Sequence, residues 1–340
     1  MGLVQHLPSH DLEKDCWPWS LETNSDIYDA ANEWPSISIV TPSLNQGRYI
    51  EETIRSVLLQ NYPNIEYIII DGGSCDNTIK ILEKYDKWIT YWTSEKDKGQ
   101  SHAINKGLKK CSGKIFNWLN SDDFLESKAL YHVATAFMKN ESALVVCGKE
   151  KSILSDYSVS EIHRGTCHKN SLEETFFYGH IDQPPTYFKK NCFDSIGYLN
   201  ENLHYMMDSE WWCRFLCKYG LEGFIKIGDI LTNFRLHRQS KSRDYNTPNR
   251  AFEIDRNTIQ CSILKSLKNP SWLFKHFEKK NRVFDYNNSW DFTLFNKSKL
   301  LDLFAQRMVH DLRKSSRTVK AVRPKVYSIY KQLESKLLLS

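Results

Sequence analysis

The chain has 340 residues, of which 41% are hydrophobic and 13% aromatic, enough for a sizeable core and too apolar for large-scale disorder. The formal net charge is only +5. From Lys297 to the end the chain holds eleven Lys and Arg against three Asp and Glu, a net +8, so the remainder carries −3. This distribution argues against a nucleic-acid-binding protein.

Neither the first residues nor the strand-sized apolar runs predict a signal peptide or a transmembrane helix. We therefore expect a cytoplasmic protein. The nine cysteines contain no CxxC pair and are typical of small buried hydrophobes in a cytosolic chain. A zinc site at Cys213 and Cys217, or at Cys167 and His168, is an alternative that no paired-ligand spacing supports.

Strands and helices alternate along the first 150 residues. Continuous apolar runs, such as 65–70, indicate strands buried on both faces, as in a parallel sheet. The predicted elements are strand 37–40, helix 49–58, strand 65–70, helix 77–85, strand 89–92, helix 99–109, strand 115–119, helix 127–138 and strand 143–147. This order predicts an α/β fold with an open, mostly parallel, Rossmann-like sheet flanked by helices.

Small polar or acidic residues follow three of these strands, at Thr41, Asp71 and Asn120. Ligands of open α/β sheets bind at the carboxyl ends of the strands, so the pattern predicts a binding site there. In the run Asn120-Ser121-Asp122-Asp123, adjacent carboxylates repel unless a cation or solvent compensates them. Their oxygens suit Mg²⁺ or Mn²⁺ shared with phosphates. The alternatives are a solvated pair capping the next helix and, at Asp71, an ordinary turn.

Five segments in this region resemble the donor half of the family 2 glycosyltransferases, inverting enzymes with the GT-A fold that include chitin and cellulose synthases. The matching segments are 39–45, 69–78, 94–100, 103–107 and 120–123. The resemblance implies a GT-A fold and transfer of a sugar from a nucleotide-diphosphate donor, expected to be a UDP-sugar. The implied acceptor is a hydroxyl of a glycan or lipid-linked molecule in surface polysaccharide or lipopolysaccharide synthesis.

The resemblance also implies a role for each matching residue. Asp122 is the expected ligand of Mn²⁺ or Mg²⁺ in a DxD motif whose first position is Asn120. Asp71 is expected to contact the uracil or ribose. The full set expected to bind the donor is Thr41, Pro42, Ser43, Asp71, Asp97, Gln100, Asn105, Asn120, Ser121 and Asp123.

The segments 183–188, 196–203 and 205–215 resemble a narrower subset of the family, in which the aspartate before an aromatic helix is the general base. By position this is Asp208, which would take the proton of the acceptor hydroxyl. A helix N-cap is the alternative for Asp208, and Glu210 is the alternative base. The segment 234–242 resembles the part that follows, where His237 is expected to complete the metal site or to be an ordinary loop histidine.

We expect an irregular N-terminal extension over 1–34, a catalytic domain over 35–245 and a helical, basic extension over 246–340. Within the catalytic domain, 35–150 form the donor half and 151–245 the acceptor half. An apolar stripe runs from Leu300 to Leu312 in the basic extension. It predicts either peripheral contact with the inner face of the cytoplasmic membrane or a helix used in packing or dimerisation.

Two other functions fit an α/β fold with a strand-end site. A nucleotidyltransferase of sugar phosphates would need a Gly-rich first loop with Lys or Arg, and the loop 41–47 has neither basic residue. A non-catalytic carbohydrate-binding protein would not need Asp71, Asp122 and Asp208, which are all present.

Overall fold

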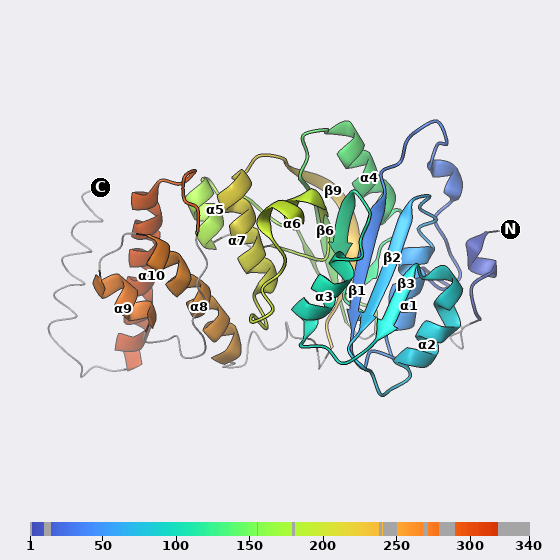
Figure 1. Ribbon diagram of the computed structural model, residues 1–340, viewed down its shortest axis with the longest axis horizontal. Helices are drawn as coiled ribbons and strands as arrows, with labels where there is room; N and C mark the ends of the chain where they lie inside the picture. Colours follow the sequence, from blue (N-terminus) through green and yellow to red (C-terminus); the bar gives the residue numbers. More distant parts are fainter. Residues whose placement is uncertain are drawn as a thin grey trace. The chain divides into compact units, whose positions relative to one another are not determined.

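The structure is a computed structural model that describes residues 2–9, 15–154, 156–178, 181–237, 240, 250–267, 271–278 and 290–318. It divides into two compact units, Met1–Arg256 and Asn257–Ser340 (Figure 1). The predicted boundary at residues 245 and 246 lies outside the described residues.

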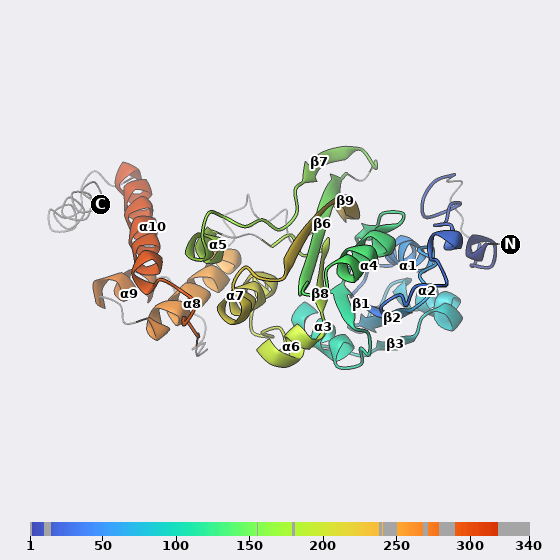
Figure 2. The same cartoon turned by 90° about the horizontal axis from the view of Figure 1, so that it is seen from above.

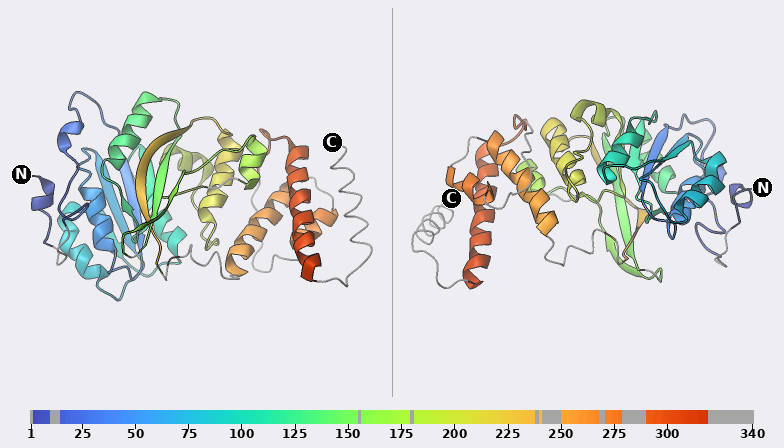
Figure 3. Two further views of the ribbon diagram at one scale, coloured as in Figure 1. Left: turned by 180° about the vertical axis from the view of Figure 1, so that it is seen from behind. Right: turned by 60° about the horizontal axis from the view of Figure 1, so that its bottom comes forward.

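The first unit is built on one nine-stranded sheet. Its strand order is β3-β2-β1-β4-β8-β6-β9-β5, and β7 pairs with β6. The strands are β1 Ile37–Ser43, β2 Ile65–Asp71, β3 Tyr91–Ser94, β4 Ile115–Trp118, β5 Phe124–Leu125, β6 Val145–Ile153, β7 Val159–His163, β8 Thr186–Lys189 and β9 Phe224–Arg235. Seen from behind, the blue strands of the first half continue into the green and gold strands of the second (Figure 3).

The α/β prediction is confirmed, but the sheet is mixed rather than mostly parallel. Strands β3, β2, β1 and β4 are parallel neighbours, as their apolar runs predict. Strand β8 is antiparallel to β4 and to β6, and β5 is antiparallel to β9, whereas β6 and β9 are parallel. The chain beyond residue 150 thus returns across the sheet instead of repeating βαβ units.

Helices cover both faces of this sheet (Figure 2). The helices of the first unit are α1 Ile50–Leu58, α2 Thr78–Tyr85, α3 Gln100–Leu108, α4 Ala129–Lys139, α5 Leu172–Tyr178, α6 Asn191–Ile196 and α7 Met207–Tyr219. Helix α8 Arg250–Ser266 begins in the first unit and ends in the second, which also holds α9 Ser271–Glu278 and α10 Lys297–Thr318. Successive side chains of β1 point to opposite faces of the sheet. Ile39 is buried in a core with Ile54 of α1, whereas Val40 faces α3, where a Cβ on Gly107 would lie 2.5 Å from its Cγ1.

An aromatic cluster packs α6 and α7 against the face of the sheet toward which Val40 points. Trp211 of α7 stacks on Phe193 of α6 at 4.1 Å and meets Phe188 of β8 edge-on at 5.0 Å. Trp211 and Trp212 are 0% and 2% exposed. Burial of large aromatic surface of this kind anchors α7 firmly, and α7 carries the predicted base.

The second unit comprises α9, α10 and the part of α8 beyond Arg256. Leu300, Phe304 and Met308 of α10 are buried, and Phe304 meets Phe277 of α9 edge-on at 5.6 Å. The predicted apolar stripe therefore packs inside this unit as far as its side chains are described. Over the described ranges, every helix is too short or too polar to span a membrane.

Candidate active site

The ends of β1 and β2 lie side by side, because Ser43 pairs with Asp71. The Asp71 carboxylate is fully buried and accepts hydrogen bonds from Gly73 N (3.0 Å), Ser74 N (2.8 Å), Ser74 Oγ (2.5 Å) and Ser94 Oγ (2.7 Å). Gly73 has a φ of +89°, which glycine adopts readily. This geometry favours shaping of the turn over the predicted contact of Asp71 with base or ribose.

The other predicted residues at this edge differ in what they offer a ligand. Thr41 is fully buried and its Oγ1 shares a hydrogen bond with Tyr67 (3.2 Å), so it supports the strand end. Pro42 lies between Thr41 and Ser43 on β1. The buried Ser43 Oγ has no hydrogen-bond partner among the described residues. A buried hydroxyl without a partner is costly, so it is well suited to meet a ligand.

Asp97 lies against the same turn. Its Oδ1 accepts from Gly99 N at 2.8 Å, and its Oδ2 is 2.8 Å from where a Cβ on Gly72 would be. Gly72 is therefore needed for the Asp97 carboxylate to approach the turn after β2. This brings Asp97 and Asp71, predicted from separate segments, to one place.

The 120–123 run follows β4 and is held by side chains from two helices. Gln100 of α3 donates to Asn120 Oδ1 (2.7 Å), and Asn120 donates to Asp123 Oδ2 (3.1 Å). Thr53 of α1 donates to the carbonyls of Ser121 (3.0 Å) and Asp123 (2.7 Å). Ser121 is thus bound through its backbone, and the run has a fixed conformation.

The two adjacent acids have opposite environments. Asp123 is 1% exposed. Burial, and then the charge of Asp122, raises the pKa of Asp123 well above its ordinary value. The Asp122 side chain is 19% exposed, and its Oδ2 lies 2.8 Å from Nε2 of His237. Asp122 is therefore the acid that can meet a ligand, while Asp123 is part of the interior and not a solvated cap.

His237 and Arg235 both hold the Asp122 region from the end of β9. The His237 ring lies 4.8 Å from that of Tyr49. Arg235 donates from Nε to the Asp122 carbonyl (3.0 Å) and from its backbone N to Asp123 Oδ1 (2.9 Å). The sequence signal for Arg235 was its place in the same segment as His237, but its bonds could not be read from that segment. Residues 238, 239, 241 and 242 of this segment lie outside the described residues.

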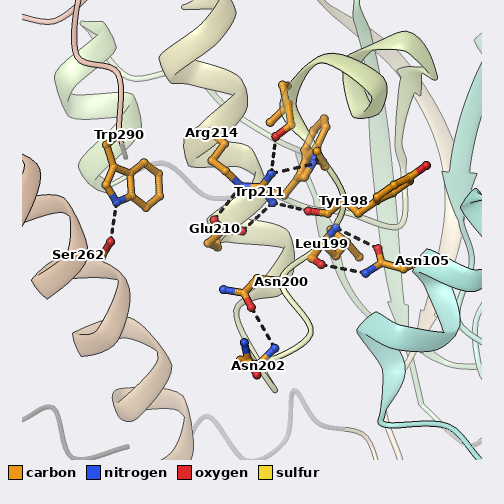
Figure 4. A network of polar contacts seen from close by, with 12 residues as sticks. Asn105, Tyr198, Leu199, Asn200, Asn202, Glu210, Trp211, Arg214, Ser262 and Trp290 are labelled. Atoms are coloured by element: carbon orange, nitrogen blue, oxygen red, sulfur yellow. Dashed lines mark hydrogen bonds and ion pairs between the residues drawn. The ribbon is translucent and has the colours of Figure 1, made fainter. Parts of the chain in front are cut away.

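On the acceptor side, Asp208 lies in the first turn of α7 and is partly exposed. Its Oδ1 accepts from Ser209 N at 2.6 Å. Glu210, by contrast, is fully buried and bound by Arg214 through Nε at 2.8 Å and Nη2 at 2.9 Å (Figure 4). A fully buried carboxylate with both oxygens bound by one arginine is out of reach of an acceptor hydroxyl, so the geometry disfavours the Glu210 alternative.

Two residues fix the loop before α7. Asn105 donates to the Leu199 carbonyl (2.9 Å) and accepts from Leu199 N (3.0 Å) (Figure 4). It also donates to Glu201 Oε1 (2.9 Å). It is 3% exposed, so positioning this loop is favoured over the predicted contact with the donor. Asp255 of α8 accepts from the backbone N of residues 204, 205 and 206 at 2.9, 2.7 and 3.2 Å. Sequence reasoning missed Asp255, since no motif surrounds it.

A divalent cation fits this site only as one shared with a ligand. Within the described part of the chain, no group of three or more His, Cys, Asp and Glu side chains is arranged to hold a metal, which includes the cysteine positions considered for zinc. Asp122 and His237 supply one carboxylate and one imidazole side by side. Mn²⁺ and Mg²⁺ accept such open sites when phosphates and water complete the coordination.

A mixed α/β sheet with an acidic, histidine-bearing cluster at its carboxyl strand ends agrees with the GT-A fold expected from the sequence. Residues 38–215 match the model of glycosyl transferase family 2, and the chain belongs to that family. It carries a glycosyltransferase domain.

Several known proteins are similar to this chain. An uncharacterized glycosyltransferase of Rickettsia typhi is 29% identical over 64% of this chain and 67% of its own length, and one of Rickettsia prowazekii is 32% identical over 60% and 64%. The chain thus spans about two thirds of these relatives. The putative teichuronic acid biosynthesis glycosyltransferase TuaG of Bacillus subtilis is 40% identical over 26% of this chain and 36% of its own.

Two solved structures share the fold. S. aureus TarS, in complex with UDP-GlcNAc, has a TM-score of 0.54 and 19% identity, covering 81% of this chain and 80% of that chain. The mannosyltransferase PcManGT of Pyrobaculum calidifontis, in complex with GDP-Man and Mn²⁺, has a TM-score of 0.50 and 14% identity, covering 95% and 84%. The predicted GT-A fold is confirmed.

Proposed function

We propose that the chain is an inverting, metal-dependent glycosyltransferase that uses a UDP-sugar. The observation that carries this proposal is the 2.8 Å contact between Asp122 and His237, with the Asp122 carboxylate partly exposed at the end of β4. A carboxylate and an imidazole at the carboxyl ends of parallel strands suit a diphosphate with its cation. The UDP-GlcNAc bound to TarS supports the choice of nucleotide.

Asp122 and His237 would hold Mn²⁺ or Mg²⁺, with the donor diphosphate completing the coordination. When bound, the cation offsets the negative charge that develops on the departing diphosphate. The Mn²⁺ in the PcManGT structure supports this choice. Ser43, Asp97 and Gln100 would face the donor, while Thr41, Pro42 and Asp71 would support the strand ends and Asn105 would hold the loop before α7.

Asp208 is the proposed general base. The acceptor hydroxyl oxygen bonds to the anomeric carbon as the bond from that carbon to the nucleoside diphosphate breaks on the opposite face. The hydroxyl proton passes to the Asp208 carboxylate. Asp208 suits this role because it is partly exposed, in contrast to the buried, arginine-bound Glu210.

We propose a glycan or lipid-linked acceptor in the synthesis of a cell-surface polysaccharide, which the similarity to TuaG supports. This reaction would take place in the cytoplasm or at the inner face of the cytoplasmic membrane. Because the apolar stripe of α10 is packed within its unit, membrane contact would rest on the +8 charge of the C-terminal segment.

A donor-turnover assay tests the proposal. The chain is incubated with common nucleotide sugars in either about 1 mM Mn²⁺ or EDTA. The nucleotide that is released is then measured. Asp122→Asn and His237→Ala should abolish Mn²⁺-dependent release, and the exposed-site control Asp26→Asn should not. If the wild-type chain shows neither donor turnover nor metal-dependent nucleotide binding, the proposal that it is a glycosyltransferase enzyme is refuted. Pyrophosphate release from UTP and a sugar phosphate would favour the nucleotidyltransferase instead.

A further inference from the structure

Arg235 is a buried cation whose described hydrogen bonds converge on the 120–123 run and α1. Its side chain is 3% exposed, and Nη2 donates to Glu52 Oε2 at 2.6 Å. Its Nε donates to the Asp122 carbonyl, and its backbone N donates to Asp123 Oδ1. Burial of an arginine costs desolvation energy, and stability alone is a weak reason for a buried ion pair.

Three aromatic rings surround the guanidinium. Its Cζ lies 5.1 Å from the ring centre of Tyr49, 5.4 Å from that of Phe124 and 5.1 Å from that of Tyr157. The Tyr157 hydroxyl also donates to Glu52 Oε2 at 2.9 Å. Helix α1, strand β5 and the connection between β6 and β7 therefore lock one orientation of the guanidinium.

Asp122 is consequently held at both ends, since Arg235 binds its carbonyl and His237 meets its carboxylate. Tyr49 lies between the two, with its ring near both Arg235 and His237. We propose that Arg235 is a positioning residue for glycosyl transfer, which sets the direction of the Asp122 carboxylate toward the donor diphosphate and its cation. This role rests on the function proposed above for Asp122. At 3% exposure, Arg235 acts through the aspartates.

Arg55 provides a matched control for replacing this arginine. It lies on α1 and is 1% exposed. Its guanidinium donates to the carbonyls of Pro18 (3.0 Å) and Trp19 (2.7 Å) in the N-terminal segment. Arg235→Lys and Arg55→Lys both keep a buried positive charge and both lose the planar fork that serves several acceptors at once. They differ in whether the lost contacts belong to the Asp122 region.

The full chain and its variants are compared by calorimetric titration of UDP at several Mn²⁺ concentrations, with free Mn²⁺ followed by electron paramagnetic resonance. Loss of a residue that orients a metal ligand weakens metal binding roughly 10–100-fold. We expect Arg235→Lys to raise both the Mn²⁺ requirement and the UDP Kd by roughly tenfold or more, with UDP binding in EDTA unchanged. Arg55→Lys should lower the Tm without moving either quantity by more than about twofold.

Glu52→Gln supplies a second variant should Arg235→Lys fold poorly, because it keeps the shape of the Arg235 partner and removes its charge. It should raise the Mn²⁺ requirement in the same direction by a smaller factor. The positioning role would be overturned if folded Arg235→Lys or Glu52→Gln kept the wild-type Mn²⁺ dependence of UDP binding. It would also be overturned if Arg55→Lys raised the Mn²⁺ requirement as much as Arg235→Lys does. A wild-type chain without Mn²⁺-dependent UDP binding would instead overturn the proposed function itself.

Discussion

Replacing Arg214 by methionine tests how the helix that carries Asp208 is anchored. Arg214 forms a bidentate pair with Glu210, which is fully buried, while the Arg214 side chain is 14% exposed. It also donates to three carbonyls at the end of α6 and in the loop that follows it, those of Ile196 (2.9 Å), Gly197 (3.3 Å) and Tyr198 (2.6 Å). One side chain therefore ties α7 to that loop and neutralises a buried carboxylate.

Arg214→Met would leave the Glu210 charge buried without its cation, a change that costs about 3–5 kcal/mol when one partner of a buried pair is removed. The slight exposure of Arg214 places the expected loss near the lower end, about 3 kcal/mol. In Glu210→Met/Arg214→Met the buried charge is gone, and the remaining cost comes from loop carbonyls that water can partly satisfy, about 1–2 kcal/mol. The double variant should therefore be the more stable of the two.

Hydrogen exchange of the α7 amides measures this difference. A chain of two units need not unfold in a single step, so protection of 207–219 is more informative than one global transition. The opening free energies of the α7 amides should be about 1–2 kcal/mol higher in the double variant than in Arg214→Met, the difference between the two costs. If α7 in the double variant exchanges as fast as in Arg214→Met, the buried charge of Glu210 is not the source of the cost.

Asp208→Asn should abolish sugar transfer and leave the UDP Kd near the wild-type value, and loss of nucleotide binding would show that the role is misassigned. Asn105→Ala removes the hydrogen bonds that hold the loop at Leu199. It should therefore raise the acceptor KM and leave the UDP Kd within about twofold of the wild-type value. UDP binding weakened about tenfold would show instead that Asn105 acts at the donor site. At pH 8, iodoacetamide should modify the exposed Cys75 and spare Cys111, whose pKa burial raises to about 12; equal labelling of the folded chain would contradict this burial. Binding to anionic vesicles, if it occurs through the basic segment, should disappear at about 0.5 M salt, and persistence at that concentration would indicate apolar insertion.

The first half of the fold is predictable because each element satisfies a local rule. Strands β1, β2 and β4 are rich in apolar residues and almost wholly buried on both faces, and the helices between them have amphipathic spacing. The second half is not, because its strands depend on distant partners. Strand β9 has twelve residues with no regular alternation of burial, and β5 has only two residues, which pair with β9.

The site shows the same division between local and distant information. The acids at strand ends are visible in sequence, since parallel strands bring their carboxyl ends to one edge. What each side chain contacts is not visible. The Asn105 amide bonds to residues 94 and 96 positions away, and the Asp255 carboxylate to a loop about 50 positions away. Polar groups satisfied within the protein and polar groups directed to a ligand have the same sequence signature.

Asparagine at position 120, the first of the run expected to act as a DxD motif, is explained by its two hydrogen bonds. The Asn120 amide accepts from Gln100 through Oδ1 and donates to Asp123 through Nδ2, so it needs one acceptor and one donor. An aspartate there could still accept from Gln100, but its second oxygen would lie where Nδ2 is now, 3.1 Å from the Asp123 carboxylate. Two carboxylates at that separation cannot both stay ionised, and one would have to hold a proton. Asn120 avoids this conflict, and because its own side chain is committed to Gln100 and Asp123, Asp122 is left as the carboxylate of the run that can face a cation.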